Sequence, residues 1–271
     1  MELLAGFYTN SLALLADSAH MLTDLAALTL SLIALRISAR PATHQKTYGY
    51  LRVEILAALV NGVFLVVVAV SISYEAYHRL AAPPVVQSKL MLLVACIGLI
   101  GNVITVALLY RTQHENLNVR GAFLHVIADT LGSVGAITAG VAMEVWQLYI
   151  SDPIASLVVA VLVLYSSWKL VRESVDVLLE GTPEHLNISS ILADLGSMGG
   201  VVSVHELHVW SITLGMPAMS CHVVVRQDQD PSVVLAGLSS LMRDKYHIEH
   251  TTIQIEMERW VVPRVGSAPL F

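Results

Sequence analysis

Residues 11–24 read SLALLADSAHMLTD and open the first of about five long apolar runs in the chain. Crossing the hydrocarbon core of a bilayer takes roughly 20 mostly apolar residues, and each run has about that length. Continuous apolar character fits helices, because lipid-exposed strands would have to close into a barrel. The sequence therefore predicts about five transmembrane helices, which begin near Leu12, Val53, Leu90, Gly121 and Pro153.

The composition favours a membrane protein over a soluble globule. Of the 271 residues, 55% are hydrophobic and 13% charged, and the mean hydropathy is +0.68. The net charge is −6 and the basic residues lie in short loops, which argues against a nucleic-acid surface. Cys96 and Cys221 have neither the number nor the spacing of a disulfide framework.

Lys and Arg residues lie mostly on one side of the predicted helices. Basic loop residues are retained on the cytoplasmic side of a membrane, so this side and the C-terminal half should be cytoplasmic. Five crossings then place the N-terminus outside, and we expect a further helix upstream. The cytoplasmic side has Arg36, Arg40, Lys46, Arg52, Arg111, Arg120, Lys169 and Arg172, and the other side has Arg79 and Lys89.

The fifth run opens with Asp152 and Pro153. An aspartate followed by proline is typical of a helix cap with proline in the first turn. We therefore expect Asp152 to cap the helix that it begins.

Hydropathy drops from about residue 180, where Gly181-Thr182-Pro183 breaks the chain. We predict a transmembrane domain over residues 1–180 and a small cytoplasmic domain over residues 181–271. The pattern in the second domain predicts helix, strand, strand, helix and strand, over 189–195, 201–212, 218–225, 232–246 and 251–257. This order suits an α+β unit with two helices on one face of a three-stranded sheet.

Two of the apolar runs carry a histidine and an aspartate four residues apart. These pairs are His20 with Asp24 and His125 with Asp129. At 3.6 residues per turn each pair lies on one helix face, so two facing helices would offer four ligands. Tetrahedral binding by imidazole and carboxylate suits Zn²⁺, whereas Mg²⁺ and Ca²⁺ prefer shells of oxygen alone.

The cost of polar groups in a membrane supports this interpretation. An aspartate at mid-membrane costs about 2.5 to 3.5 kcal/mol, so it should face a cavity and have a partner. The alternative is that these pairs only hold helices together by hydrogen bonds, the role that we expect for Asn102. Asp17, one turn before His20, is expected to relay protons or to cap the cavity.

Residues 11–24 and the stretch HENLNVRGAFLH at 114–125 resemble the zinc-exporting branch of the cation diffusion facilitator family. The resemblance implies that His20, Asp24, His125 and Asp129 form the transport site. The family has six membrane helices, so this chain would keep only the tail of the first, around residues 2–8. Short loops make it similar to bacterial members, which implies a multi-pass protein of the inner membrane.

The resemblance also implies a homodimer with a metallochaperone-like, ferredoxin-like cytoplasmic domain. Positions that match cytoplasmic metal ligands are His205, His222 and Glu256, and Gln254 stands where some members have histidine. A structural zinc ion in this domain is thus one interpretation. Plain solvated histidines are the other, because most surface histidines have no ligand role.

We expect a zinc/proton antiporter that needs no cofactor, with zinc as its substrate. Only neutral imidazole binds metal, and histidine has an unperturbed pKa of about 6.5, so protons compete with Zn²⁺ near neutral pH. A membrane-embedded zinc hydrolase is disfavoured: HExxH does not occur, and four protein ligands leave no position for a reactive water. A non-transporting, metal-sensing partner subunit is the other alternative.

Overall fold

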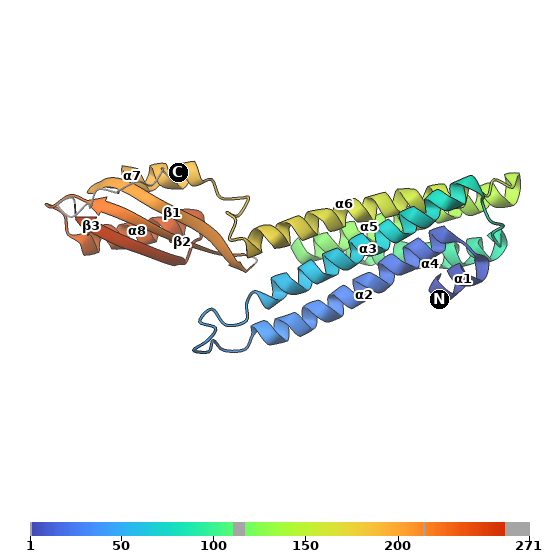
Figure 1. Cartoon of the computed structure of the whole chain (residues 1–271), viewed down its shortest axis with the longest axis horizontal. Helices are drawn as coiled ribbons and strands as arrows, with labels where there is room; N and C mark the ends of the chain where they lie inside the picture. Colours follow the sequence, from blue (N-terminus) through green and yellow to red (C-terminus); the bar gives the residue numbers. More distant parts are fainter. Residues whose placement is uncertain (1, 111–116, 214, 258–271) are drawn as a thin grey trace. The chain divides into compact units, whose positions relative to one another are not determined.

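The computed structural model describes residues 2–110, 117–213 and 215–257, without the side chains of residues 2, 117–122, 124, 125 and 128. Figure 1 labels the elements. The helices of the apolar part are α1 (Glu2–Thr9), α2 (Leu12–Ser38), α3 (Val53–Ala81), α4 (Ser88–Tyr110), α5 (Leu117–Trp146) and α6 (Ser151–Leu178). The remaining elements are α7 (Ile188–Ser197), β1 (Val201–Thr213), β2 (Met216–Val225), α8 (Pro231–Tyr246) and β3 (His250–Met257).

The chain forms two compact units. One contains Met1–Leu30 and Val60–Val171, and the other contains Ser31–Leu59 and Arg172–Phe271. The second unit thus includes the small α+β domain together with the ends of α2, α3 and α6. Because the two units are built from interleaved segments, the boundary between residues 180 and 181 stays a prediction.

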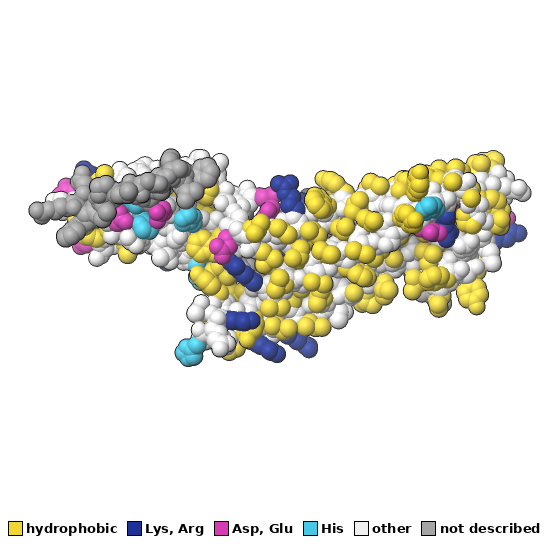
Figure 2. Space-filling view, in the orientation of Figure 1, with side chains coloured by type: hydrophobic (Ala, Val, Ile, Leu, Met, Phe, Trp, Pro, Cys, Tyr) yellow, Lys and Arg dark blue, Asp and Glu magenta, His cyan; other side chains and the backbone are white. Residues whose placement is uncertain are grey.

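Long helices lie where the five apolar runs predicted them. Within the described residues, α2, α3, α4 and α6 are long and apolar enough to cross a membrane, and most of their apolar surface is exposed. Helix α5 has 30 residues, and at 1.5 Å per residue this length also exceeds a hydrocarbon core of about 30 Å. Figure 2 shows hydrophobic side chains over the visible face of these helices. This surface identifies a multi-pass membrane protein.

Small residues and one polar pair join α4 to α5. A Cβ atom on Gly140 would lie 2.7 Å from Cδ2 of Leu92, so only glycine permits this approach of the two helices. Asn102 Nδ2 donates to Ser133 Oγ at 3.3 Å, which fits the predicted helix-to-helix role of Asn102. Met91 and Met143 are fully buried in the core between these helices.

The start of α2 is held by a carboxylate from a distant helix. Asn10 has a left-handed φ of 58°, which separates α1 from α2. Asp152, 0% exposed, accepts hydrogen bonds from Ser11 Oγ at 2.6 Å, Leu12 N at 2.7 Å and Ala13 N at 3.2 Å. The expectation that Asp152 caps its own helix was wrong: α6 begins at Ser151, and the Asp152 side chain satisfies the first amides of α2.

The small domain has the predicted order of elements. Strand β1 pairs antiparallel with β2, and β2 pairs parallel with β3 through the crossover helix α8. One face of the sheet packs against Ile191 and Leu195 of α7 and against Leu238 and Met242 of α8. Because side chains alternate along a strand, the odd-numbered residues of β2 face these helices and His222 lies on the other face.

A polar tie joins the two helices of this domain. Asp194 on α7 accepts hydrogen bonds from Lys245 Nζ and Tyr246 Oη at the end of α8, both at 2.5 Å. These two bonds, and the positive charge of Lys245, hold the pKa of Asp194 below its usual value. The tie therefore adds most to stability when the carboxylate is ionised.

Replacing Asp152 should destabilise the helical unit. Asp152→Ala leaves a buried hydroxyl and two buried amides without their acceptor, at a cost of about 2–5 kcal/mol. Asp152→Asn should lose less, since the amide oxygen still accepts. Thermal unfolding of the full chain in detergent measures both, and an alanine variant that melts at the wild-type temperature would refute the role.

The contribution of Asp194 should depend on pH. Its pKa is lowered in the folded state, so its stabilisation is present above the unfolded pKa of about 3.9 and is lost as pH falls through the folded pKa. Asp194→Asn should therefore reduce hydrogen-exchange protection of α7 at pH 7, and the deficit should shrink below about pH 4. Asp244→Asn on α8 is the control, and an equal deficit at both pH values would contradict the assignment.

Candidate metal centres

Three of the four predicted transport ligands lie together between α2 and α5. His20 Nε2 lies 3.8 Å from Asp24 Oδ2, one turn along α2, and 3.7 Å from Asp129 Oδ1 on α5. All three ligand atoms lie within 4.8 Å of one another. The i to i+4 spacing of His20 and Asp24 places both side chains toward α5, as the sequence predicted.

The distances fit a small divalent cation. Bonds of about 2.0–2.2 Å from zinc to nitrogen and oxygen place tetrahedral ligand atoms about 3.4 Å apart. The pairs at 3.7 and 3.8 Å need to close by only a few tenths of an ångström. Two carboxylates also balance the charge of a divalent cation, and one imidazole favours zinc or a related transition ion over Mg²⁺.

His125 lies in α5 four residues before Asp129, and its side chain lies outside the described residues. Helical spacing puts His125 and Asp129 on the same face of α5. Its role as the fourth ligand stays a prediction.

A cavity of about 830 Å³ adjoins this centre. His20 and Asp129 line it together with Asp17, and apolar side chains of α5 and α6 form most of the remaining wall. Asp17 is 6% exposed, and a Cβ atom on Gly132 would lie 3.4 Å from its Oδ1 atom. Asp17 thus lines the cavity, and its two expected roles, relaying protons or capping the cavity, stay predictions. Low polarity in the wall strengthens the attraction between carboxylates and a cation.

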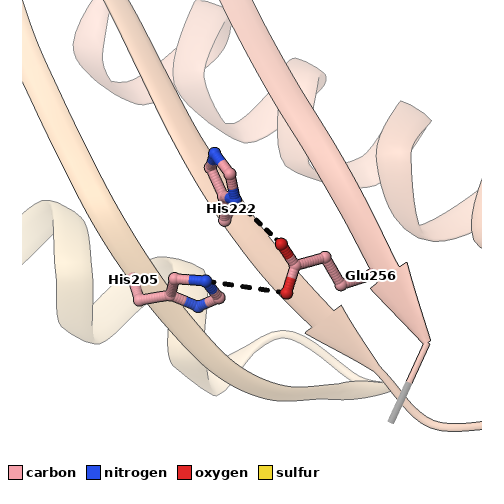
Figure 3. Close-up of side chains that lie close together, drawn as sticks. All are labelled: His205, His222 and Glu256. Carbon is pink, nitrogen blue, oxygen red and sulfur yellow. Dashed lines mark hydrogen bonds and ion pairs between the residues drawn. The ribbon is translucent and has the colours of Figure 1, made fainter. Parts of the chain in front are cut away.

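A second cluster lies on the open face of the small sheet, with one residue from each strand (Figure 3). His205 and His222 are cross-strand partners in β1 and β2, with ring centroids 5.2 Å apart. Glu256 of β3 extends toward both rings: its Oε1 lies 2.8 Å from His222 Nδ1, and its Oε2 lies 3.6 Å from His205 Nε2. The structure therefore brings together the three residues that resemblance implied.

The environment of Glu256 keeps it ionised. The hydrogen bond with His222 lowers the pKa of Glu256, and the charge of His205 lowers it further. Gln254 Nε2 also donates to Glu256 Oε1 at 3.2 Å. An ionised carboxylate beside two imidazoles is a donor set that zinc accepts.

One neighbour of this cluster was missed at the level of sequence. Glu206 follows His205 directly, has a left-handed φ of 51°, and lies with Oε2 3.5 Å from His222 Nε2. The sequence did contain a sign of the irregularity in β1. Apolar residues recur at Val204, Leu207 and Val209, and the first two are three positions apart where a regular strand would have them two apart.

These features define a class of protein: a multi-pass helical membrane protein with a small α+β domain. Among its long helices lies a cluster of one histidine and two aspartates that could hold a metal ion. Residues 1–179 match the family model of the cation efflux transmembrane domain, and residues 183–258 match that of the cation efflux protein cytoplasmic domain. The chain belongs to the cation efflux family. The expected resemblance to the zinc-exporting branch of the cation diffusion facilitators is thereby confirmed.

Curated relatives resemble the chain over nearly its whole length. The cadmium, cobalt and zinc/H(+)-K(+) antiporter of Bacillus subtilis is 42% identical, over 95% of this chain and 84% of the relative. The zinc transporter ZitB of Shigella flexneri is 42% identical, over 95% and 83%. The solved metal-bound C-terminal domain of the CzcD transporter from Cuprividus metallidurans is 33% identical over 26% of this chain and 99% of that domain, with a TM-score of 0.26.

Proposed function

We propose that this chain exports Zn²⁺ or a chemically similar divalent cation from the cytoplasm in exchange for protons. The observation that carries the proposal is the meeting of His20, Asp24 and Asp129 between two membrane-length helices. Family membership and the named activities of relatives, a zinc transporter and a cadmium, cobalt and zinc antiporter, support it. Bacterial relatives also favour the inner membrane, with the small domain in the cytoplasm.

Ion binding needs the ligands in their basic forms. In the proposed cycle the cytoplasmic cation binds His20, Asp24 and Asp129, and His125 completes the shell. Binding displaces protons from these groups, because a protonated imidazole nitrogen has no lone pair for a metal. The cation and the protons therefore compete for the same atoms, and this competition links their movements.

Exchange also requires that the site open to one side of the membrane at a time. On the far side, protonation of the ligands weakens the site and releases the cation. The apolar cavity beside α5 and α6 is the proposed route to one side, since it reaches His20 and Asp129. Water in such a route would hydrate the cation as it leaves the carboxylates.

The cytoplasmic domain is proposed to join two copies of the chain and to bind metal. The family model that matches residues 183–258 is named for a dimer, which supports a homodimer. His205, His222 and Glu256 offer two nitrogens and a carboxylate within 4.8 Å, so they would hold a zinc ion there. No catalytic role is proposed for either centre.

Loss of one carboxylate should stop transport. Asp129→Ala removes a ligand and its negative charge, so zinc-driven proton flux in proteoliposomes should fall by more than about 100-fold, beyond the typical cost of losing a mere outer-shell partner. A metal-sensitive dye and a pH dye measure both fluxes together. Asp176→Ala near the end of α6 is the control. Undiminished zinc-driven proton flux in Asp129→Ala would refute the transport site. If the wild-type chain binds zinc but carries no flux, the alternative of a non-transporting, metal-sensing subunit is favoured.

Exchanging the nitrogen ligand should change the metal preference. His20→Asp replaces a borderline imidazole by a hard oxygen, which should raise transport of Mn²⁺ relative to Zn²⁺ by about tenfold or more. Competition flux with the two ions in one vesicle preparation measures this ratio. The same ratio in variant and wild type would argue that His20 does not touch the cation.

A further inference from the structure

Strand β1 contains an extra residue beside the cytoplasmic cluster. The register with β2 shifts between His205 and His208. Val204 and Leu207 both pack against the core, so two successive residues, His205 and Glu206, lie between core-facing positions that a regular strand would separate by one. This arrangement is a β-bulge, a feature that redirects side chains.

The bulge places Glu206 in a backbone conformation that its side chain disfavours. Its φ of 51° is left-handed, a region that glycine occupies freely and that glutamate rarely adopts. Such a conformation costs free energy and persists only where the surrounding structure holds it. A glutamate at this position therefore needs a reason other than local stability.

Its position supplies that reason. Glu206 Oε2 lies 3.5 Å from His222 Nε2, while the other ring nitrogen, Nδ1, lies 2.8 Å from Glu256. The ring of His222 thus lies between two carboxylates, one at each nitrogen. Figure 3 shows one nitrogen of His222 directed at Glu256 and the other directed away from it.

These two contacts differ in what a bound metal would do to them. His205 and Glu256 lie on the Nδ1 side of His222, so an ion held by all three residues binds Nδ1. A metal-bound imidazole is neutral and carries its proton on the other nitrogen, here Nε2. That N–H needs an acceptor, and carboxylates commonly serve as such acceptors behind metal-binding histidines.

We propose that Glu206 is a positioning residue of the cytoplasmic metal site: it accepts the Nε2–H of His222 and keeps Nδ1 free for the ion. The inference rests on the proposed metal-binding role of His205, His222 and Glu256. Glu206 Oε2 and His222 Nε2, 3.5 Å apart, need to approach by only a few tenths of an ångström to form this hydrogen bond. The strained bulge is the structural cost of supplying this acceptor.

Replacement by glycine separates this role from folding. Glu206→Gly relieves the left-handed strain, so the melting temperature should stay or rise, while zinc affinity should fall about 10–100-fold. Glu206→Gln keeps an oxygen that accepts the Nε2–H, so most of the affinity should return. Glu249→Ala, a change of an exposed glutamate just before β3, is the control.

The measurement uses the full chain in detergent with the transport centre disabled by Asp24→Ala and Asp129→Ala. Competition with a chelating dye gives the zinc dissociation constant. Nitrogen NMR of labelled histidine reports the tautomer of His222, which should be Nε2-protonated with zinc bound and should lose this preference in Glu206→Gly.

The outcomes are separable. If Glu206→Gly and the wild type have the same zinc affinity and the same His222 tautomer, the proposed role of Glu206 is overturned. A Gln variant as weak as the Gly variant would also overturn it, because Glu206 would then be a ligand itself. If His222→Ala leaves the zinc affinity unchanged, the proposed cytoplasmic metal site is refuted as well. If His222→Ala lowers the zinc affinity and Glu206→Gly does not, only the inference about Glu206 is overturned.

Discussion

Asp24 and Asp129 are ionisable groups among helices whose other surfaces are mostly apolar, and the free-energy cost of placing such groups in a membrane constrains the helical unit. Ionisable groups away from water are tolerated when they face a polar partner or a cavity. Here they converge on His20, which requires α2 and α5 to be neighbours with their polar faces inward. The remaining surfaces of the long helices are then free to be apolar toward lipid. One polar cluster thus fixes which way these two helices face.

The two faces of the sheet in the small domain carry different kinds of residue. The face covered by α7 and α8 holds the buried apolar residues, and the open face holds the imidazole and carboxylate groups. Period-two alternation produces both, since neighbouring residues of β2 face opposite sides. The open face can therefore carry polar groups without disturbing the buried apolar core on the other face. At the bulge between His205 and His208 of β1 this alternation gives way.

Patterns confined to one element were predictable, and contacts between distant elements were harder to infer. Apolar length gave the long helices, and i to i+4 spacing gave the His20 and Asp24 pair. Asp152 was assigned to its own helix because caps are inferred from adjacent residues, whereas its carboxylate contacts the start of α2. Glu206 was missed because regular alternation assigns it to the core face. Its position depends on a bulge, and only the spacing of Val204 and Leu207 hinted at one.

The cysteine beside His222 has a consequence for the kinds of metal that the proposed site in the small domain would accept. Cys221 is 1% exposed on the covered face, and burial raises the pKa of its thiol to about 11. Sulfur is therefore kept out of the open-face cluster, although it lies next to that cluster in the sequence. Monovalent copper prefers thiolate and thioether ligands. A sheet that turns its sulfur inward offers this competitor only nitrogen and oxygen ligands at the open-face cluster.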